Sequence, residues 1–575
     1  MIDNSPPAAR ARLAAWEAAR PANFFEADPA LQRALRLYLG DARFAALRPR
    51  LSAAGHAAAT IVDEAARLND RPENHPRLER WSGTGERIEQ IEFHPSYHAA
   101  GRPLYESGVL ALQAEPGHAL EQAALLYLFG HCGEMGHLCP AVCTAGLIRA
   151  LQAKGSPALQ ARYLPPLLDP SYDRRQTGAQ FLTEVQGGSD VGANVVRATP
   201  VPGQPGVWRI NGEKWFCSNA TAEQILITAR PDGAPEGTRG LGLFLMPRSL
   251  PDGRLNGIEL RRLKTKFGTR TMASAEMDFH DALAYQVGAV EEGIHIVLES
   301  VINTSRWLNA IGSLGALRRA EIEARAFAAH RVAFGHPIIE YPLVQEALAE
   351  IAADLAGGLA VTWRLSHLVD RQDLGQASRQ ERAVFRLLVN LNKYRTSIAS
   401  SLGIRRAQEI FGGNGAIEDF SIIPRLYRDA VVYESWEGSH NVLCVQALRD
   451  MSRYRLDESL LASLRADLDR VTAPPLAALA QELLTCLETT EVRLGRVLSA
   501  DSAYGQAHVR RVLGELAAVV EATYLVAEAD GALARDLPPV APDLLTVFFN
   551  RHLRPDYDPL ADPDYLPRLD RLARG

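Results

Sequence analysis

The sequence predicts a mainly helical α+β fold, in which a β domain lies between helical regions. Residues 1–175 are rich in Ala, Leu and Arg with few strand signals, so we expect an N-terminal helical domain. Between 176 and 290, short strand-like runs alternate with Gly and Pro. Helical periodicity returns at 291–450 and continues through 451–575. At 575 residues the chain can form several domains of ordinary size.

Strand-like runs define the predicted β domain. They cover residues 225–228, 243–245 and 275–279. Two more runs, 207–210 and 214–217, flank an Asn211-Gly212 dipeptide, which is a typical two-residue hairpin turn. We therefore expect a β-hairpin at this position.

The clearest helix of the second half begins at Pro342, which suits a first helical turn. Four apolar residues then fall on one helical face: Val344, Leu348, Ile351 and Leu355. This stripe predicts a core or subunit-interface helix. Periodicity within 479–497 and 512–534 predicts further helices near the C-terminus.

Charge and hydropathy do not favour nucleic acid or membranes as partners. With 62 basic and 68 acidic residues the net charge is -6. No apolar run approaches the ~20 residues that a membrane span needs, and the first residues lack the order of a signal peptide. We expect a cytoplasmic protein. Lysine is scarce beside arginine, which indicates codon composition rather than a binding strategy; it occurs at 154, 214, 264, 266 and 393.

Six cysteines in a chain of this length do not indicate a disulfide framework. The spacing of Cys139 and Cys143 could place two metal ligands on one helix face. Pro140 and small apolar neighbours instead favour a buried thiol pair, and we expect no metal.

The most informative segment for chemistry is Trp436-Glu437-Gly438. A carboxylate against an indole ring loses hydration, which raises its pKa and suits it to act as a general base. Gly438 lets the backbone pass close to a ligand. Taken in isolation, Trp-Glu-Gly is better explained as an acidic residue near the positive end of a helix N-terminus.

Two glycine-containing segments point to a large ligand. The run Gly412-Gly-Asn-Gly415 follows a helix-like segment, and is consistent with close backbone approach to a ligand or with a helix C-cap. Residues 183–190, Thr-Glu-Val-Gln-Gly-Gly-Ser-Asp, offer hydroxyl and N–H groups to phosphate or heterocycle atoms.

Together these segments resemble the acyl-CoA dehydrogenase superfamily over roughly residues 90–450, and most closely its AidB-type branch. The resemblance is carried by Glu92-Phe-His-Pro95, Leu138-Cys-Pro140, Gln186-Gly-Gly-Ser-Asp190, Lys214-Trp-Phe216, Arg331-Val-Ala-Phe-Gly-His-Pro337 and Trp436-Glu-Gly438. It implies an N-terminal helical domain, a central β-sandwich or barrel and a C-terminal four-helix bundle. Residues 451–575 are then an additional helical extension.

The resemblance implies α,β-dehydrogenation of an acyl-CoA or a carrier-linked acyl thioester. Glu437 would be the general base, and N5 of FAD would receive the hydride. Some relatives place the base before an arginine of an earlier helix, but this position is Ser305, before Arg306. An electron acceptor such as electron-transfer flavoprotein and a homotetramer are also implied.

The same resemblance implies the binding residues. FAD contacts fall on Leu182, Thr183, Ser189, Phe216, Ser218, Arg331, Phe334, Glu409, Gly412, Gly413, Ser439 and Asn441. Substrate contacts fall on Ser189, Arg306, Trp436 and Gly438. Arg331, Phe334 and the Gly412-Gly413 loop would reach the cofactor of a neighbouring subunit. Glu409 stands where many relatives have glutamine, so we expect its carboxylate to be neutralised or turned away from the cofactor.

The alternative is an AidB-type flavoprotein associated with DNA or the alkylation response, because the extension of that branch is held to contact DNA. Here the extension carries 14 Arg and no Lys against 19 acidic residues, a net charge of -5. Phosphate neutralisation needs clustered positive charge, so the composition favours the dehydrogenase. A local basic face at Arg510, Arg511, Arg551 and Arg554 keeps the alternative open.

Overall fold

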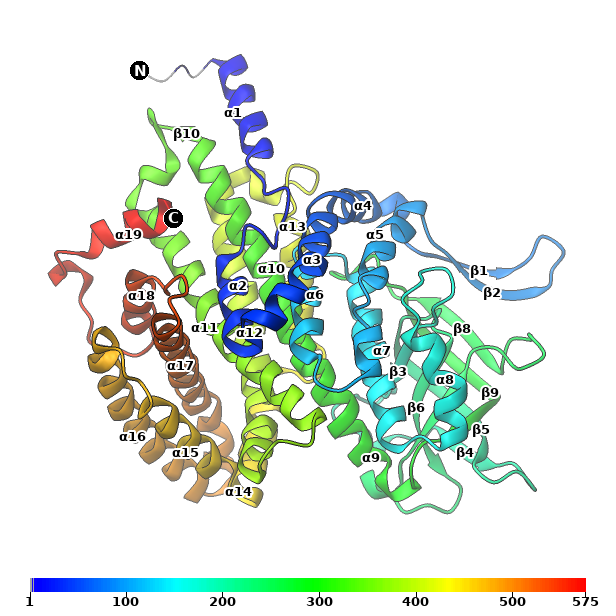
Figure 1. The fold of residues 1–575 in the computed structure, drawn as a ribbon. Coiled ribbons are helices and arrows are strands. Elements are labelled where there is room, and N and C mark those ends of the chain that lie inside the picture. Colours follow the sequence, from blue (N-terminus) through cyan, green and yellow to red (C-terminus); the bar gives the residue numbers. More distant parts are fainter. Residues whose placement is uncertain (1–2, 4, 575) are drawn as a thin grey trace. The chain divides into compact units, whose positions relative to one another are not determined.

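The computed structural model describes residue 3 and residues 5–574 (Figure 1). The chain forms two compact units. The first contains the residues up to Thr60, Leu126–Gly133 and everything from Asn309 onward, and the second contains Ile61–Leu125 and Glu134–Leu308. The predicted domain boundaries at 175, 290 and 450 stay predictions.

A seven-stranded sheet forms the centre of the second unit. Its strands are β3 (Gly178–Phe181), β4 (Arg197–Pro200), β5 (Val207–Ser218), β6 (Gln224–Pro231), β7 (Gly242–Pro247), β8 (Ile258–Leu263) and β9 (Ser274–Gln286). They pair in the order β3-β6-β4-β5-β9-β7, with β8 on β9, and a further pairing of β6 with β7 closes the ring. Closure produces a barrel around a buried apolar core, as the predicted fold class requires.

The three strand-like runs at 225–228, 243–245 and 275–279 lie within β6, β7 and β9, so these predictions are confirmed. The predicted hairpin at Asn211-Gly212 is wrong. Strand β9 pairs with both halves of β5, and a register shift between Ile210 and Gly212 keeps β5 continuous. Gly212 accommodates this bulge at φ +131, where its missing side chain leaves room for Val196.

Helices and a hairpin complete the second unit. Its helices are α4 (Asp63–Asn69), α5 (Pro95–Glu106), α7 (Met135–Lys154), α8 (Pro157–Leu168) and α9 (Gly293–Ile296), and its hairpin pairs β1 (Arg77–Trp81) with β2 (Arg87–Glu92). The hairpin is not predicted by the sequence. In α7, Cys139 and Cys143 are both buried with their sulfur atoms 4.0 Å apart, which confirms the thiol pair.

The first unit is helical apart from one two-stranded hairpin, β10 (Val332–Ala333) and β11 (His336–Pro337). Its helices before the extension are α1 (Pro6–Ala18), α2 (Pro29–Leu39), α3 (Asp41–Ala57), α11 (Pro342–Asp373), α12 (Arg379–Phe411), α13 (Ile423–Ser435) and α14 (His440–Tyr454). Two helices cross the boundary between the units, α6 (Ala119–Gly130) and α10 (Asn303–His330).

Helix α11 begins at Pro342 as predicted. Leu348, Ile351 and Leu355 are buried on it, and Val344 is half-buried. Helix α12 packs against α11, α13 and α14, which places its buried side chains beside the segment that follows α13. Among the described helices, none is long and apolar enough to cross a membrane.

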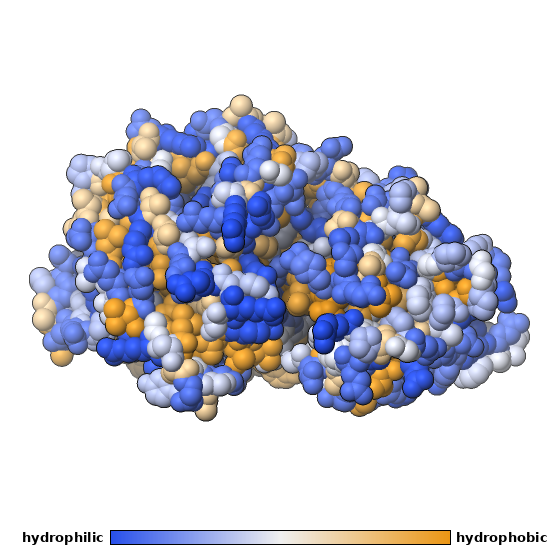
Figure 2. Space-filling model, turned by 90° about the horizontal axis from the view of Figure 1, so that it is seen from below, coloured by the Kyte–Doolittle hydropathy of each residue, from blue (hydrophilic) through white to orange (hydrophobic). Residues whose placement is uncertain are grey.

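The extension adds α15 (Leu456–Leu468), α16 (Ala477–Ser499), α17 (Ser502–Ala534), α18 (Pro542–His552) and α19 (Tyr565–Arg574). The helices predicted within 479–497 and 512–534 are confirmed as α16 and α17. Helix α17 packs on α11, α12 and α16, so the extension shares the core of the first unit. On the face in Figure 2, apolar residues form separate patches between hydrophilic ones.

Candidate active site

Glu437 lies in a tight turn between α13, which ends at Ser435, and α14, which begins at His440. Trp436 is extended, whereas Glu437 and Gly438 have φ values of +56° and +100°. Left-handed backbone favours glycine and costs a residue with a side chain roughly 1 kcal/mol. The turn therefore holds the carboxylate in a conformation that its surroundings must enforce.

Lys393 of α12 binds the backbone of this turn. Its Nζ donates hydrogen bonds to the carbonyl oxygens of Glu434, at 3.1 Å, and of Gly438, at 2.8 Å. Lys393 is completely buried. One ammonium group thus holds the backbone on both sides of Glu437.

A polar network surrounds the same turn. Ser401 donates a hydrogen bond to the carboxylate of Glu434, and the Ser397 hydroxyl lies 3.2 Å from Nε2 of His440. Nδ1 of His440 is 3.7 Å from that carboxylate. Burial lowers the pKa of His440 to about 4, with smaller contributions from Lys393 and Arg510. The imidazole is therefore neutral at pH 7.

Residues on both sides of Glu437 suit ligand contact. The Trp436 ring stacks on buried Tyr433, with 5.4 Å between centroids and 21° between planes. Trp436 Nε1 is buried and has no hydrogen-bond partner among the residues that the structure describes. Ser439 and Asn441 are exposed, and Asn441 Oδ1 accepts a hydrogen bond from Arg510 of the extension at 3.2 Å.

The glycine run closes α12. Gly412 caps the helix at φ +59°, and both it and Gly413 are exposed, with no atom within 4 Å of where a Cβ would lie. Gly415 is different, because a Cβ there would meet the carbonyl oxygen of Gln408 at 2.4 Å. Glu409 is exposed. Gly412 and Gly413 thus present open backbone, as contact with a large ligand requires.

The β10–β11 hairpin carries Arg331 and Phe334. Phe334 and Gly335 form its two-residue turn, with φ values of +50° and +90°. Phe334 is 94% exposed, and Arg331 is exposed. An aromatic ring in a left-handed turn, away from the core of its own chain, is available to a binding partner.

In the second unit, buried Lys214 organises the loop after β3. Its Nζ bonds to the carbonyl oxygen of Leu182 at 3.1 Å and forms an ion pair with Glu184 at 2.8 Å. The carbonyl oxygen of Thr183 accepts a hydrogen bond from Trp215 N at 2.9 Å. The loop is thus fixed at its base, while Thr183 is half-buried and Ser189 exposed.

Phe216 and Ser218 lie on β5 beside that loop. The Phe216 ring is 52% exposed, and Lys264 Nζ lies 3.5 Å from the Trp215 ring centroid and 4.8 Å from that of Phe216. Ser218 is half-buried and lies 3.4 Å from the Ser274 hydroxyl. Exposed rings beside anchored hydroxyls can accept a flat heterocycle with phosphate groups.

Ser305 and Arg306 are both buried in α10. The Ser305 hydroxyl donates to Gln180 Oε1 at 3.5 Å. A serine cannot replace a carboxylate as a base, so the resemblance leaves Glu437 as the predicted base. The role of Arg306 in substrate binding stays a prediction.

Sequence reasoning used Lys214 only as part of a family motif, without a role, and did not single out Lys393. The scarcity of lysine was the signal that could have found them. The chain has five lysines, and four of them contact a segment that contains a predicted site residue, or a residue on the strand paired with such a segment: Lys214, Lys264, Lys266 and Lys393.

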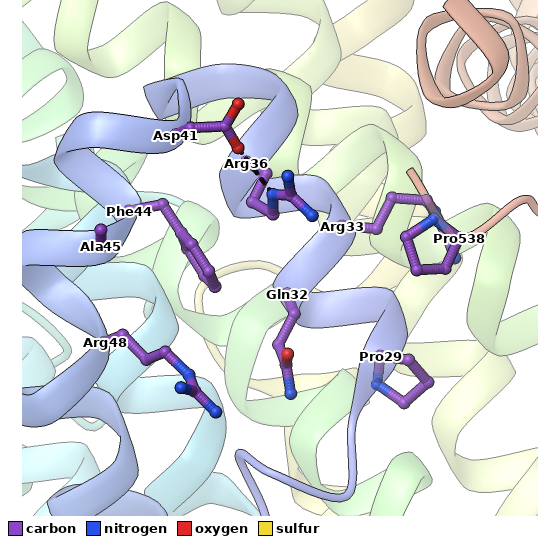
Figure 3. Close-up of a pocket in the computed structure, with 9 residues that line it drawn as sticks. All are labelled: Pro29, Gln32, Arg33, Arg36, Asp41, Phe44, Ala45, Arg48 and Pro538. Carbon is purple, nitrogen blue, oxygen red and sulfur yellow. Dashed lines mark hydrogen bonds and ion pairs between the residues drawn. The ribbon is translucent and has the colours of Figure 1, made fainter. Parts of the chain in front are cut away.

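The first unit also contains a cavity of about 430 Å³ between α2, α3 and Pro538. Figure 3 shows three arginines at its wall: Arg33, Arg36 and Arg48. Each is ion-paired, to Glu528, Asp41 and Glu26 respectively. Its lining includes none of the sequence-predicted site residues, so this cavity is separate from the Glu437 turn.

Three family profiles cover most of the chain. The adaptive response protein AidB N-terminal domain matches residues 16–174, the acyl-CoA dehydrogenase middle domain 179–282, and the acyl-CoA dehydrogenase C-terminal domain 291–452. The boundaries of these matches agree with the strand and helix regions described above.

Individual proteins give the same result. The Escherichia coli putative acyl-CoA dehydrogenase AidB is 34% identical over 66% of this chain and 70% of its own length. Acyl-CoA dehydrogenase family member 11 of Caenorhabditis elegans is 31% identical over 75% and 71%. The crystal structure of C. elegans ACDH-11 in complex with C11-CoA has a TM-score of 0.84 and 26% identity, covering 94% of this chain and 92% of that one.

Proposed function

The chain belongs to the acyl-CoA dehydrogenase family, and from that premise we propose that it is an FAD-dependent oxidoreductase that introduces a double bond between Cα and Cβ of an acyl thioester. The observation that carries this proposal is the Glu437 turn. It presents one carboxylate, in an enforced left-handed conformation, directly beside the half-buried Trp436 ring.

Glu437 is the general base of the proposed reaction. It takes the α-proton of the substrate, and the electrons of that C–H bond form the double bond as the β-hydride leaves. Negative charge that develops on the thioester oxygen needs hydrogen-bond donors. The backbone N–H of Glu437 is the donor that the family resemblance assigns. When bound, FAD supplies the acceptor for the hydride.

The residues present fit FAD. Open backbone at Gly412-Gly413, the half-exposed Phe216 ring and the hydroxyls of Thr183 and Ser189 suit its pyrophosphate and ring system. Glu409 is exposed, so water can solvate its carboxylate. The residues proposed to hold FAD are Leu182, Thr183, Ser189, Phe216, Ser218, Arg331, Phe334, Glu409, Gly412, Gly413, Ser439 and Asn441.

We propose that the substrate is an acyl-CoA or a carrier-linked acyl thioester, held by Ser189, Arg306, Trp436 and Gly438. The relative ACDH-11 is known in complex with C11-CoA, which supports a CoA thioester. Electron-transfer flavoprotein is the proposed electron acceptor. We also propose a homotetramer, which the family resemblance implies; the exposed Phe334 and Arg331 are available to contact a second subunit.

Glu437→Gln tests the assignment. The amide has nearly the size of the carboxylate but cannot accept the α-proton, so flavin bleaching by acyl-CoAs under anaerobic conditions should slow by roughly 10²–10⁴. Glu437→Asp, which keeps the charge on a shorter side chain, should give an intermediate rate. Bleaching of the Gln variant at the parent rate would remove Glu437 from the role of base.

A second candidate function is AidB-type association with nucleic acid. The match of residues 16–174 to the AidB N-terminal domain favours it. The charge of the extension does not, because ion pairs engage Arg551 with Glu350 and Asp354, and Arg554 with Glu482. Of the suggested basic face, Arg510 and Arg511 are the exposed arginines.

A further inference from the structure

We propose that Lys393 is a positioning residue for Glu437, and that its ammonium group sets the geometry of the catalytic turn by binding the carbonyl oxygens of Glu434 and Gly438. The inference rests on the proposed role of Glu437 as the base. The proposal gives helix α12 a role in the site, although α12 lies outside the sequence motifs around Glu437.

The two acceptors lie on opposite sides of Glu437 in the chain. Glu434 belongs to the last turn of α13, whose carbonyl groups lack partners within the helix. A cation at this end also interacts favourably with the helix dipole. Gly438 is the residue immediately after Glu437. Lys393 therefore connects the end of the helix to the far side of the turn.

Burial makes this connection stiff. An ammonium group without solvent is costly unless hydrogen bonds replace its hydration. Lys393 is completely buried, so movement of either carbonyl oxygen away from Nζ removes a hydrogen bond that bulk water cannot replace. The resulting penalty opposes any relaxation of the turn.

The turn needs such a restraint because Glu437 has a left-handed φ of +56°. A glutamate without restraint prefers right-handed or extended backbone, and either change would turn its carboxylate in a new direction. The orientation of a base must be maintained closely for proton transfer to be fast.

Helix α12 supplies two further contacts at helical spacing. Ser397 lies one turn beyond Lys393 and contacts His440, while Ser401, after a second turn, binds the carboxylate of Glu434. Lys393, Ser397 and Ser401 thus form a polar stripe on one face of α12. The stripe contacts the turn at its start, its end and the first residue of α14.

Lysine suits this position better than arginine. Its compact ammonium has three donors that can point at converging carbonyl oxygens, whereas guanidinium is planar and larger. This accounts for a buried lysine in a chain whose basic residues are mostly arginine.

Hydrogen–deuterium exchange of the full-length protein tests the proposal. In Lys393→Met the length of the side chain is retained without its donors, and exchange in peptides spanning 434–441 should accelerate by about tenfold to a hundredfold. Lys393→Gln keeps an N–H donor and should give a smaller acceleration. It replaces Lys393→Met in the experiment if the Met variant does not fold. Uniform acceleration across the chain, or none, would overturn the proposal.

Ser400→Ala is the matched control. Ser400 is also completely buried on α12, but its hydroxyl has no hydrogen-bond partner among the described residues. Its removal should leave exchange at 434–441 within about twofold of the parent, since no contact to the turn is lost. Acceleration equal to that in Lys393→Met would show a general effect of altering α12.

Flavin reduction provides a second readout. In Lys393→Met the limiting reduction rate should fall about tenfold or more, while the half-saturating acyl-CoA concentration changes less than about twofold. A change in half-saturation alone would assign Lys393 to substrate binding instead. If no acyl-CoA reduces even the parent, the proposed function fails, while the exchange experiment still decides whether Lys393 restrains the turn.

Discussion

Arg510 donates a hydrogen bond to Oδ1 of Asn441 at 3.2 Å, which joins helix α17 of the extension to the residue four places after Glu437. The extension is thus in direct contact with the segment that follows the proposed base. Its arginines contribute mainly to contacts within the protein: Arg465, Arg493, Arg551, Arg554 and Arg568 are all ion-paired.

We expect weak binding to duplex DNA at physiological salt. The extension has a net charge of -5, and its ion-paired arginines are unavailable to phosphates. Fluorescence anisotropy of a labelled duplex, measured at several salt concentrations, checks this. Tight binding that weakens steeply with salt and disappears in an Arg510→Ala, Arg511→Ala double variant would instead support the AidB-type function.

His440 should make stability depend on pH. Its folded pKa of about 4 lies below the ordinary 6.5, so the unfolded chain takes up the proton first as pH falls. Its contribution is present above pH 6.5 and is lost progressively as the pH falls to about 4. Burial, Lys393 and Arg510 outweigh the Glu434 carboxylate, which lies 3.7 Å away.

Urea unfolding of His440→Gln at pH 7 and pH 4.5 measures this effect. The variant should lose less stability than the parent between the two pH values. His280→Gln, at an exposed histidine, is the control and should follow the parent. Equal pH dependence of all three proteins would contradict the assignment.

Phe334→Gly should separate folding from assembly. Glycine relieves the left-handed backbone at φ +50°, so the melting temperature of the monomeric fold should stay the same or rise. Loss of the exposed ring should weaken the oligomer and the flavin content together. Size-exclusion chromatography with flavin absorbance tests this, and Arg331→Ala should act in the same way. Full flavin occupancy in a monomeric variant would exclude contacts across subunits.

Two glycines of one loop should respond differently to alanine. Gly413→Ala meets open space and should keep parental stability while lowering flavin occupancy. Gly415→Ala places a Cβ 2.4 Å from the Gln408 carbonyl oxygen and should cost roughly 1–3 kcal/mol. Thermal melts and the flavin-to-protein absorbance ratio measure both effects. Normal flavin content in Gly413→Ala would remove this loop from the cofactor site.

Local sequence patterns predicted the strands that are buried along their length and the helix that buries one apolar face. Strands β6 and β7 are buried along their length, so they stand out as apolar runs, and α11 carries its apolar stripe after Pro342. The turn at Asn211-Gly212 failed because pairing with β9, a strand about 70 residues away, outweighs the local turn preference.

The candidate site was predictable only where residues are adjacent in sequence. The sequence Trp436-Glu437-Gly438 indicates an unusual turn. The residue that binds the backbone of this turn, Lys393, lies more than 40 positions earlier in the chain. No local pattern connects the two, because helix packing brings them together. The same holds for Lys214, whose hydrogen bond to Leu182 crosses between β5 and the end of β3.

The scarcity of lysine and the burial of Lys214 and Lys393 also affect how readily thioesters can acylate the protein itself. Acyl thioesters transfer their acyl group to amines, and a lysine reacts only when it is accessible and deprotonated. The structure describes all five lysines, and of these only Lys154 is exposed, where it is ion-paired with Glu292. Lys214 and Lys393 are buried, so thioesters cannot reach their amines, and the contacts that hold Lys393 at the Glu437 turn also shield it from acylation.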